Sequence, residues 1–354
     1  VVHADDAGGP AARAVDEPCP IEGETPDAAH LDAGQIIRIA REIGADAIHP
    51  GYGFLAENAA FAEAVEAAGI RFIGPDPEVI RLMGDKIASR RFVAEQGFPL
   101  TPSASEEDDP SDFADRAAAI GFPLLVKASA GGGGKGMQIV RRRPDLTPAI
   151  ETARSEAVRY FADGRLYAER YVEQPRHIEV QILADAHGNV IHLGERDCSI
   201  QRRFQKLVEE TPAPKLEPSV RDQICEQAVA IARAADYRNA GTVEFVLAPD
   251  GAFYFLEMNT RLQVEHPVTE MVTGLDLVEA QIRIAAGEPL RVQQSQISFE
   301  GASIECRLCA EDPGEDFRPA VGELLVVRPP EGPGVRFDGG IAEGQRVTTA
   351  FDPM

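Results

Sequence analysis

Positive charge is scarce in this sequence, and lysine is scarcer still. The 354 residues include 35 lysines and arginines against 58 aspartates and glutamates, which gives a formal net charge of −23. A field of this sign repels nucleic acids and anionic lipid surfaces, so we expect no nucleic acid and no membrane among the partners. Arginine fills most basic positions, and the chain has only five lysines: Lys86, Lys127, Lys135, Lys206 and Lys215.

Cysteine and long apolar runs are also sparse. The five cysteines are scattered and odd in number, which argues against a disulfide framework. Cys306 and Cys309 form a C-x-x-C pair, but it lacks the second pair or histidine partner of a zinc site, so we interpret both as strand residues. No run approaches the ~20 apolar residues of a membrane span, and no signal-peptide pattern occurs. We therefore expect a soluble, cytoplasmic protein.

The length of 354 residues predicts two or three domains, and the apolar pattern predicts an α/β protein. Residues 1 to about 75 alternate short buried strands with amphipathic helices, including a helix over 32–43 and strands over 45–49 and 70–73. This order predicts a parallel sheet covered by helices. From residue 122 onward strands and hairpins dominate, and the tail 301–354 is β-rich. Because the chain begins at Val1 inside an expected strand and stops without a closing element, we expect a fragment that is truncated at both ends.

A glycine run is the most prominent motif. Gly131, Gly132, Gly133 and Gly134 lie between two expected strands, where backbone amides without Cβ atoms nearby can cradle a phosphate chain. Lys127 and Lys135 would suit a triphosphate. The run is not a Walker A loop, because Gly136 follows Lys135 where serine or threonine is required. A flexible connector is the alternative interpretation.

Two carboxylates on an expected hairpin suggest a metal site. A turn centred on Pro249 and Asp250 would place Glu244 opposite residue 255, with Glu257 as its diagonal neighbour about 7–8 Å away. Such a pair can share Mg²⁺ ions that also hold phosphates, and Asn259 on the same face adds an oxygen ligand. The alternative is a pair of solvated glutamates.

Two further polar segments indicate anion chemistry. Strand-like alternation over 260–266 would send Arg261, Gln263 and Glu265 to one side, where a carboxylate beside a guanidinium stays ionised and can act as a general base. Residues 202–206 hold three cations, which favours a small-anion pocket. A surface ion pair and an ion-pair network are the respective alternatives.

Together these segments resemble the biotin carboxylases, a family with the ATP-grasp fold. The resemblance covers essentially the whole chain in order, and it rests on five motifs: 49–55 (HPGYGFL), 83–86 (MGDK), 127–137, 195–206 and 257–267. It implies an N-terminal Rossmann-like domain over 1–75, an ATP-grasp domain over 76–290 with a lid at about 99–171, and a partial β-rich C-terminal domain over 291–354.

The resemblance also implies a role for each matching residue. Those that would bind ATP are Lys86, Lys127, Gly131 to Gly134, Met137, Glu169, Val172, His177 and Gln201. The metal positions would be Glu244, Glu257 and Asn259. Bicarbonate would contact Lys206, Arg261, Gln263 and Val264, with Glu265 as the base. Arg307 would steady the enolate of biotin, near Tyr52 and Gly53. The catalytic set is thus Glu265, Arg307, Lys206 and Arg261.

The implied activity is carboxylation of biotin through carboxyphosphate, the first half-reaction of an acyl-CoA carboxylase such as acetyl-CoA carboxylase. The cofactors would be ATP and Mg²⁺ or Mn²⁺, with biotin as a carrier-bound substrate. The partners would be a biotin carboxyl carrier, a carboxyltransferase and a second copy of the chain. Phe204 and Arg170 depart from the family pattern, from which we expect altered nucleotide affinity.

Other functions remain open from the residues. These are the biotin carboxylase region of pyruvate or urea carboxylase, another ATP-grasp ligase, or an inactive ATP-binding fragment. Arg307 and the segment 261–265 argue against the second, and intact Lys206, Glu265 and Arg307 argue against the third.

Overall fold

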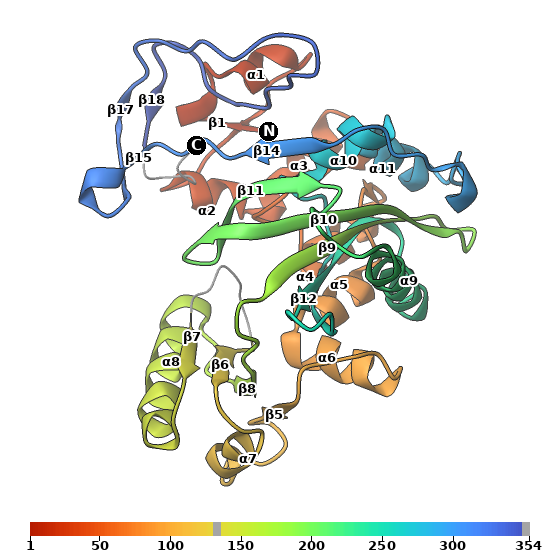
Figure 1. The fold of residues 1–354 in the computed structure, drawn as a ribbon. Coiled ribbons are helices and arrows are strands. Elements are labelled where there is room, and N and C mark those ends of the chain that lie inside the picture. The colour runs from red at the N-terminus through yellow and green to blue at the C-terminus, as the bar shows by residue number, and fades with distance from the viewer. Residues whose placement is uncertain (130–135, 349–354) are drawn as a thin grey trace.

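A computed structural model describes residues 1–129 and 136–348. The glycine run Gly131 to Gly134, expected to hold phosphates, lies outside the described residues. Figure 1 shows a central sheet, with the N-terminal helices and the short strand pairs of the C-terminal tail on one side of it and a small α/β unit on the other. Within the described ranges, no helix has the length and apolar character needed to cross a bilayer.

The N-terminal part contains short parallel strand pairs with helices around them, in line with the sequence pattern. Strand β1 pairs with β2, and β3 pairs with β4, both in parallel. The elements are β1 (Val2–His3), α1 (Pro10–Ala14), β2 (Pro20–Ile21), α2 (Pro26–His30), α3 (Ala33–Glu42), β3 (Ala47–Ile48), α4 (Ala59–Ala67) and β4 (Arg71–Phe72). Phe61, Val65, Ile70 and Phe72 form a buried core between α4 and this strand pair.

The small α/β unit in Figure 1 follows two connecting helices, α5 (Pro77–Gly84) and α6 (Lys86–Glu95). Its antiparallel sheet has the order β5-β8-β6-β7 and packs against α8. The elements are β5 (Ser103–Ser105), α7 (Phe113–Ala119), β6 (Leu124–Ala128), β7 (Met137–Val140), α8 (Leu146–Phe161) and β8 (Leu166–Arg170). The elements of this unit fall within residues 99–171, where a lid is expected, and the closing role stays a prediction.

The central sheet has six antiparallel strands in the order β13-β12-β9-β10-β11-β14. Its elements are β9 (Arg176–Ala184), β10 (Val190–Arg202), β11 (Gln205–Thr211), α9 (Pro218–Ala234), β12 (Asn239–Leu247), β13 (Phe253–Asn259), α10 (His266–Thr273), α11 (Leu277–Ala285) and β14 (Ser303–Cys306). Short pairs follow in the tail: β15 (Glu311–Asp312) with β16 (Arg318–Pro319), and β17 (Gly322–Glu323) with β18 (Arg346–Val347).

The two faces of this sheet differ because side chains alternate along each strand. On β9, Ile178, Val180 and Ile182 pack with α9, and each is fully buried. Burying an aliphatic side chain of this size contributes about 1.5–3 kcal/mol. Glu179 and Gln181 lie on the opposite face and are also buried. The sheet therefore carries a polar row on the face away from α9.

Two local predictions were wrong. The β12–β13 register shifts between Glu244 and Phe245, so Glu244 pairs directly with Glu257 while Phe245 pairs with Phe255. Leu256 is the extra residue of a β-bulge, which a regular hairpin does not contain. Residues 260–265 form no strand, so the alternation expected there does not place their side chains.

Candidate active site

Charged residues from four neighbouring strands form one row across the central sheet. Arg196 on β10 pairs with Glu179 on β9, Glu179 pairs with Glu244 on β12, and Glu244 pairs with Glu257 on β13. The first three are almost completely buried. Like charges opposite each other are destabilising, so the adjacent glutamates need cations close by.

Lys206 on β11 supplies the central cation. Its Nζ lies 2.5 Å from a carboxylate oxygen of Glu179, 2.7 Å from Glu244 and 2.6 Å from Glu265. These contacts use all three donors of the ammonium group. Burial alone would lower the pKa of Lys206, but the three carboxylates raise it well above its usual value. Lys206 is therefore charged, and it connects β9, β12 and the start of α10 through these contacts.

Glu265 lies between two cations at the start of α10. Besides Lys206, its other oxygen accepts a hydrogen bond from Nη2 of Arg307 at 2.9 Å. Burial opposes the charge of Glu265, but Lys206, Arg196 and Arg307 together lower its pKa to about 2. The carboxylate is ionised at neutral pH, but the guanidinium that contacts it belongs to Arg307 and not to Arg261, which the sequence pattern had placed beside it and which pairs with Glu57.

The other residues expected at the bicarbonate pocket surround this group. Gln263 donates to Glu244 at 3.2 Å and accepts from Arg196 at 3.3 Å. Val264 is half-buried between Gln263 and Glu265. Arg261 donates through Nε to Glu57 at 2.9 Å and through Nη2 to Asn259 at 3.3 Å. Glu57, which the sequence analysis did not single out, thus fixes Arg261 from the N-terminal part.

The expected metal positions offer oxygen donors side by side. Asn259 donates to Oε1 of Glu244 at 2.9 Å, and Lys86 at the start of α6 lies 2.9 Å from Glu257. Among the described residues, ligand atoms of His177, Glu179 and Glu244 also lie within 4.8 Å of one another. Carboxylate and amide oxygens are the ligands that Mg²⁺ prefers, so the side chains of Glu244, Glu257 and Asn259 fit that ion.

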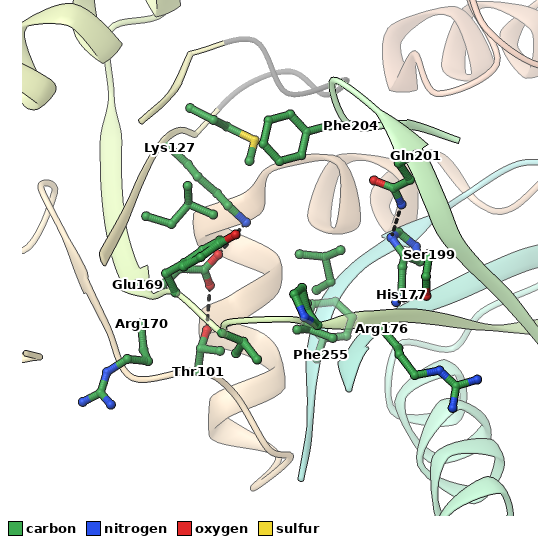
Figure 2. Close-up of a pocket in the computed structure, with 17 residues that line it drawn as sticks. Thr101, Lys127, Glu169, Arg170, Arg176, His177, Ser199, Gln201, Phe204 and Phe255 are labelled. Atoms are coloured by element: carbon green, nitrogen blue, oxygen red, sulfur yellow. Dashed lines mark hydrogen bonds and ion pairs between the residues drawn. The ribbon is translucent and has the colours of Figure 1, made fainter. Parts of the chain in front are cut away.

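A pocket between the small unit and the central sheet collects most of the expected ATP-binding residues (Figure 2). Lys127, Met137, Glu169, Val172, His177 and Gln201 all line it. Lys86 lies outside this lining and contacts the metal positions instead. The two parts are connected, because Nε2 of His177 lies 3.0 Å from Glu244.

A buried network supports one wall of the pocket. Figure 2 shows Lys127 and Thr101 both directed at the carboxylate of Glu169, at 2.5 Å and 2.6 Å. Arg90 lies 3.0 Å from the same carboxylate. Burial opposes the charge of Glu169, but Lys127 and Arg90 lower its pKa to about 2. Arg90 and Thr101 are further residues that sequence reasoning missed.

Two residues that depart from the family pattern also line the pocket. In Figure 2 the Phe204 ring covers the side of the pocket above Lys127, and Arg170 points away from it. Arg170 donates to the carbonyl of Ile120 at 2.6 Å. Phe204 can offer apolar contact but no hydrogen bond to a ligand.

The expected biotin contacts occupy an exposed turn. Tyr52 is 51% exposed, and Gly53 has a φ of 77°, a conformation that favours glycine. Cys306 and Cys309 of the C-x-x-C pair form no disulfide. Cys306 ends β14, but Cys309 lies outside any strand, so the expectation of two strand residues was wrong for Cys309.

Three family models match the chain in order. They are the biotin carboxylase N-terminal domain over residues 1–80, the carbamoyl-phosphate synthase L chain ATP-binding domain over 85–293, and the biotin carboxylase C-terminal domain over 305–354. The chain is 50% identical over 326 residues to a biotin carboxylase of Nostoc sp., covering 92% of this chain and 73% of the relative. It is 50% identical over 333 residues to the 2-oxoglutarate carboxylase small subunit of Hydrogenobacter thermophilus, covering 94% and 71%.

Solved structures agree with this relationship. The biotin carboxylase domain dimer of Hydrogenobacter thermophilus 2-oxoglutarate carboxylase, in complex with MgADP, ADP and bicarbonate, is similar with a TM-score of 0.96. It is 47% identical, and the match covers 99% of this chain and 78% of that one. The biotin carboxylase–β-γ-ATP complex from Campylobacter jejuni has a TM-score of 0.94 at 42% identity, with 100% and 79% covered. The ATP-grasp fold and the matching sequence together place the chain in the biotin carboxylase family of ATP-dependent ligases.

Proposed function

We propose that this chain carboxylates biotin with Glu265 as the general base toward bicarbonate. The observation that carries the proposal is the position of Glu265, which is 2% exposed and lies between Lys206 and Arg307. An ionised carboxylate in such surroundings can accept a proton from an anion that the same cations attract. Bound bicarbonate would attract Lys206 and Arg261. Because Lys206 would then neutralise Glu265 less, the proton affinity of Glu265 would rise at the moment of proton transfer.

The reaction then proceeds through carboxyphosphate. Glu265 takes the proton of bicarbonate and later releases it to solvent. The resulting oxygen attacks the γ-phosphorus of ATP, the bond to ADP breaks, and carboxyphosphate forms. Carboxyphosphate separates into CO₂ and phosphate, and the phosphate takes the N1 proton of biotin. The biotin nitrogen then attacks CO₂ while Arg307 stabilises the enolate oxygen, in the manner of a preorganised oxyanion site.

Electrostatics and positioning supply most of the catalysis in phosphoryl transfer. Lys86 and Lys127 would neutralise the phosphates, and Glu244, Glu257 and Asn259 would hold Mg²⁺, which neutralises phosphate charge when bound. His177 and Gln201 would lie at the ribose, and the backbone of Glu169 to Val172 at the adenine. Tyr52 and Gly53 would border biotin. The small unit over about 99–171 would close as a lid and keep water from carboxyphosphate.

The partners follow from the same chemistry. Biotin would arrive on a carrier domain or protein, and a carboxyltransferase would choose the final carboxyl acceptor. Similarity to a biotin carboxylase domain dimer supports pairing of two copies. The domain limits 1–75, 76–290 and 291–354 and a cytoplasmic location stay predictions.

Substitution of the base tests the proposal. Glu265→Gln keeps the size of the side chain but removes the base, so bicarbonate-dependent ATP cleavage should fall by roughly 10²–10⁴-fold. Nucleotide binding, measured by isothermal titration, should stay within about twofold, because Glu265 is not among the residues that line the nucleotide pocket.

The matched control is Glu279→Gln on α11, an exposed glutamate paired with Arg283. It should behave as the unsubstituted chain does. The proposed activity would be contradicted if free biotin did not stimulate ATP cleavage by the unsubstituted chain. If Glu265→Gln retained turnover, Glu265 would not be the base.

A further inference from the structure

Two glutamates face each other at the outer edge of the central sheet, next to the active site. Glu209 on β11 and Glu305 on β14 are register partners in the antiparallel ladder between these strands. Glu209 is completely buried, and Glu305 is partly buried. Two carboxylates in direct opposition repel each other if both are ionised.

Each member of the pair has one oxygen without a partner. The Oε2 atoms of Glu209 and Glu305 are both buried and, among the described residues, accept no hydrogen bond. A buried ionised oxygen without a donor is costly. The arrangement therefore suits one negative charge and one proton rather than two negative charges.

Arg307 joins this pair to the catalytic base. Its Nε donates to Oε1 of Glu209 at 2.7 Å, and its Nη2 donates to Oε2 of Glu265 at 2.9 Å. Nη2 also lies 2.7 Å from Oε1 of Glu209, so Glu209 holds the Nε–Nη2 edge of the guanidinium while Nη2 is directed at Glu265 as well. Because the group is planar and rigid, the contact with Glu209 fixes its orientation.

The charges around Glu305 favour its neutral form. Burial, together with the charges of Glu209 and Glu265, raises the pKa of Glu305 to about 8 against the opposite effect of Arg307 and Arg196. Burial also raises the pKa of Glu209, against the effect of Arg307. Of the two, Glu209 has the hydrogen bond from the guanidinium and is the better place for the negative charge.

We propose that Glu209 and Glu305 are a positioning pair for Arg307, in which ionised Glu209 orients the guanidinium and Glu305 stays neutral by holding a proton. This inference rests on the proposed role of Arg307 toward biotin. When Glu305 loses its proton, a third carboxylate faces Arg307 and competes with Glu265 and the biotin enolate for its charge. Biotin carboxylation then declines at alkaline pH, while cleavage of ATP without biotin depends mainly on Lys206 and Glu265 and changes less.

Three single substitutions test the pair. Glu209→Gln should lower kcat/KM for free biotin by roughly 10- to 100-fold, because Arg307 loses a charged hydrogen-bond partner. Bicarbonate-dependent ATP cleavage without biotin should stay within about threefold. Glu305→Gln should keep the neutral-pH rate and abolish the alkaline decline. Glu210→Gln, the next residue along β11 and on its opposite face, is the matched control and should show neither effect.

A second measurement does not depend on turnover. Infrared difference spectra of the unsubstituted chain should show a carboxylic acid C=O band that disappears as the pH is raised through about 8, and Glu305→Gln should lack this band. Absence of the band, or equal kinetics for Glu209→Gln and Glu210→Gln, would overturn the positioning pair while leaving biotin carboxylation intact. If biotin does not stimulate the unsubstituted chain, the proposed function itself fails.

Discussion

Lysine and arginine do different work in this active site. Lys86 pairs with Glu257 and Lys127 with Glu169. Lys206 contacts three carboxylates, those of Glu179, Glu244 and Glu265. A compact ammonium group fits at each place and can turn toward a phosphate. Arg196 is instead fully buried and spreads its guanidinium over five acceptors: Glu179, Gln181, Thr269, Thr242 and Gln263. A fork of fixed geometry suits that position.

This difference gives a test on stability. Arg196→Lys keeps the charge but has three donors on a flexible stem, so several buried acceptors lose their partner. We expect the free energy of unfolding to fall by about 2–4 kcal/mol. Arg283→Lys on α11, a residue in surface ion pairs, should leave the free energy of unfolding essentially unchanged. Urea denaturation of both variants makes the comparison, and equal losses would contradict it.

Sequence patterns predicted these residues unevenly. The lysines stand out because they are rare, and Glu244, Glu257, Asn259 and Glu265 occur in motifs. Glu179, Arg196 and Glu209 lie inside strands, where a charged residue does not show which partner will neutralise it. The available signal was the charged run 195–197 in the middle of a strand, because a buried strand tolerates such residues only when they are paired.

At the scale of elements, helix and strand positions were predicted well and register was not. The helix expected over 32–43 is observed as Ala33–Glu42, and the strands expected over 45–49 and 70–73 are observed as Ala47–Ile48 and Arg71–Phe72. The bulge at Leu256 is the consequential difference, because it turns diagonal neighbours into the direct pair Glu244 and Glu257. Bulges depend on packing across the sheet, which a single strand's pattern does not record.

Helix α6 shows how a cap can position a binding residue. Asp85 accepts hydrogen bonds from the backbone amides of Ile87 and Ala88, both at 2.9 Å, and Lys86 begins the helix beside it. Asp85→Ala should lower the free energy of unfolding by about 1 kcal/mol. It should also raise the Kd for ATP by roughly three- to tenfold, because the first turn that directs Lys86 frays.

The neighbouring helix provides the control for this cap. Asp76 begins α5 in the same way, but its side chain accepts no capping hydrogen bond. Asp76→Ala should therefore change ATP binding, measured by isothermal titration, by less than twofold, about the precision of such a measurement. An equal effect of the two substitutions would show that the cap does not position Lys86.

At the scale of the whole molecule, the net charge of −23 contrasts with the cations that gather around the candidate active site. The acidic residues near the active site are buried, or half-buried in the case of Glu257, and they pair with Lys86, Lys127, Lys206, Arg196 and Arg307, so the folded state depends on their ionisation. The sequence predicted the excess of negative charge. It did not predict which carboxylates the fold would bury, since that depends on register and on side chains from distant elements.

Buried ionised carboxylates make stability depend on acid pH. The pKa values of Glu169 and Glu265 are both about 2 in the folded chain, below the value of 4.5 for an exposed glutamate. A lowered pKa stabilises the folded state fully above about 4.5, and this contribution is lost as the pH falls toward 2. Each such group adds at most about 1.4 kcal/mol per pH unit to the slope.

We therefore expect the free energy of unfolding, measured in urea at a series of pH values, to decline steeply between about pH 4.5 and pH 2. Glu169→Gln has no proton to gain, so it should be less stable at pH 7, show a shallower acid slope, and converge with the unsubstituted chain near pH 2. Glu173→Gln removes an exposed glutamate from the same region and should leave the slope unchanged. Parallel slopes for the unsubstituted chain and Glu169→Gln would mean that Arg90 and Lys127 do not keep Glu169 ionised. The ion pairs of Glu169 would then not be what stabilises this wall of the nucleotide pocket.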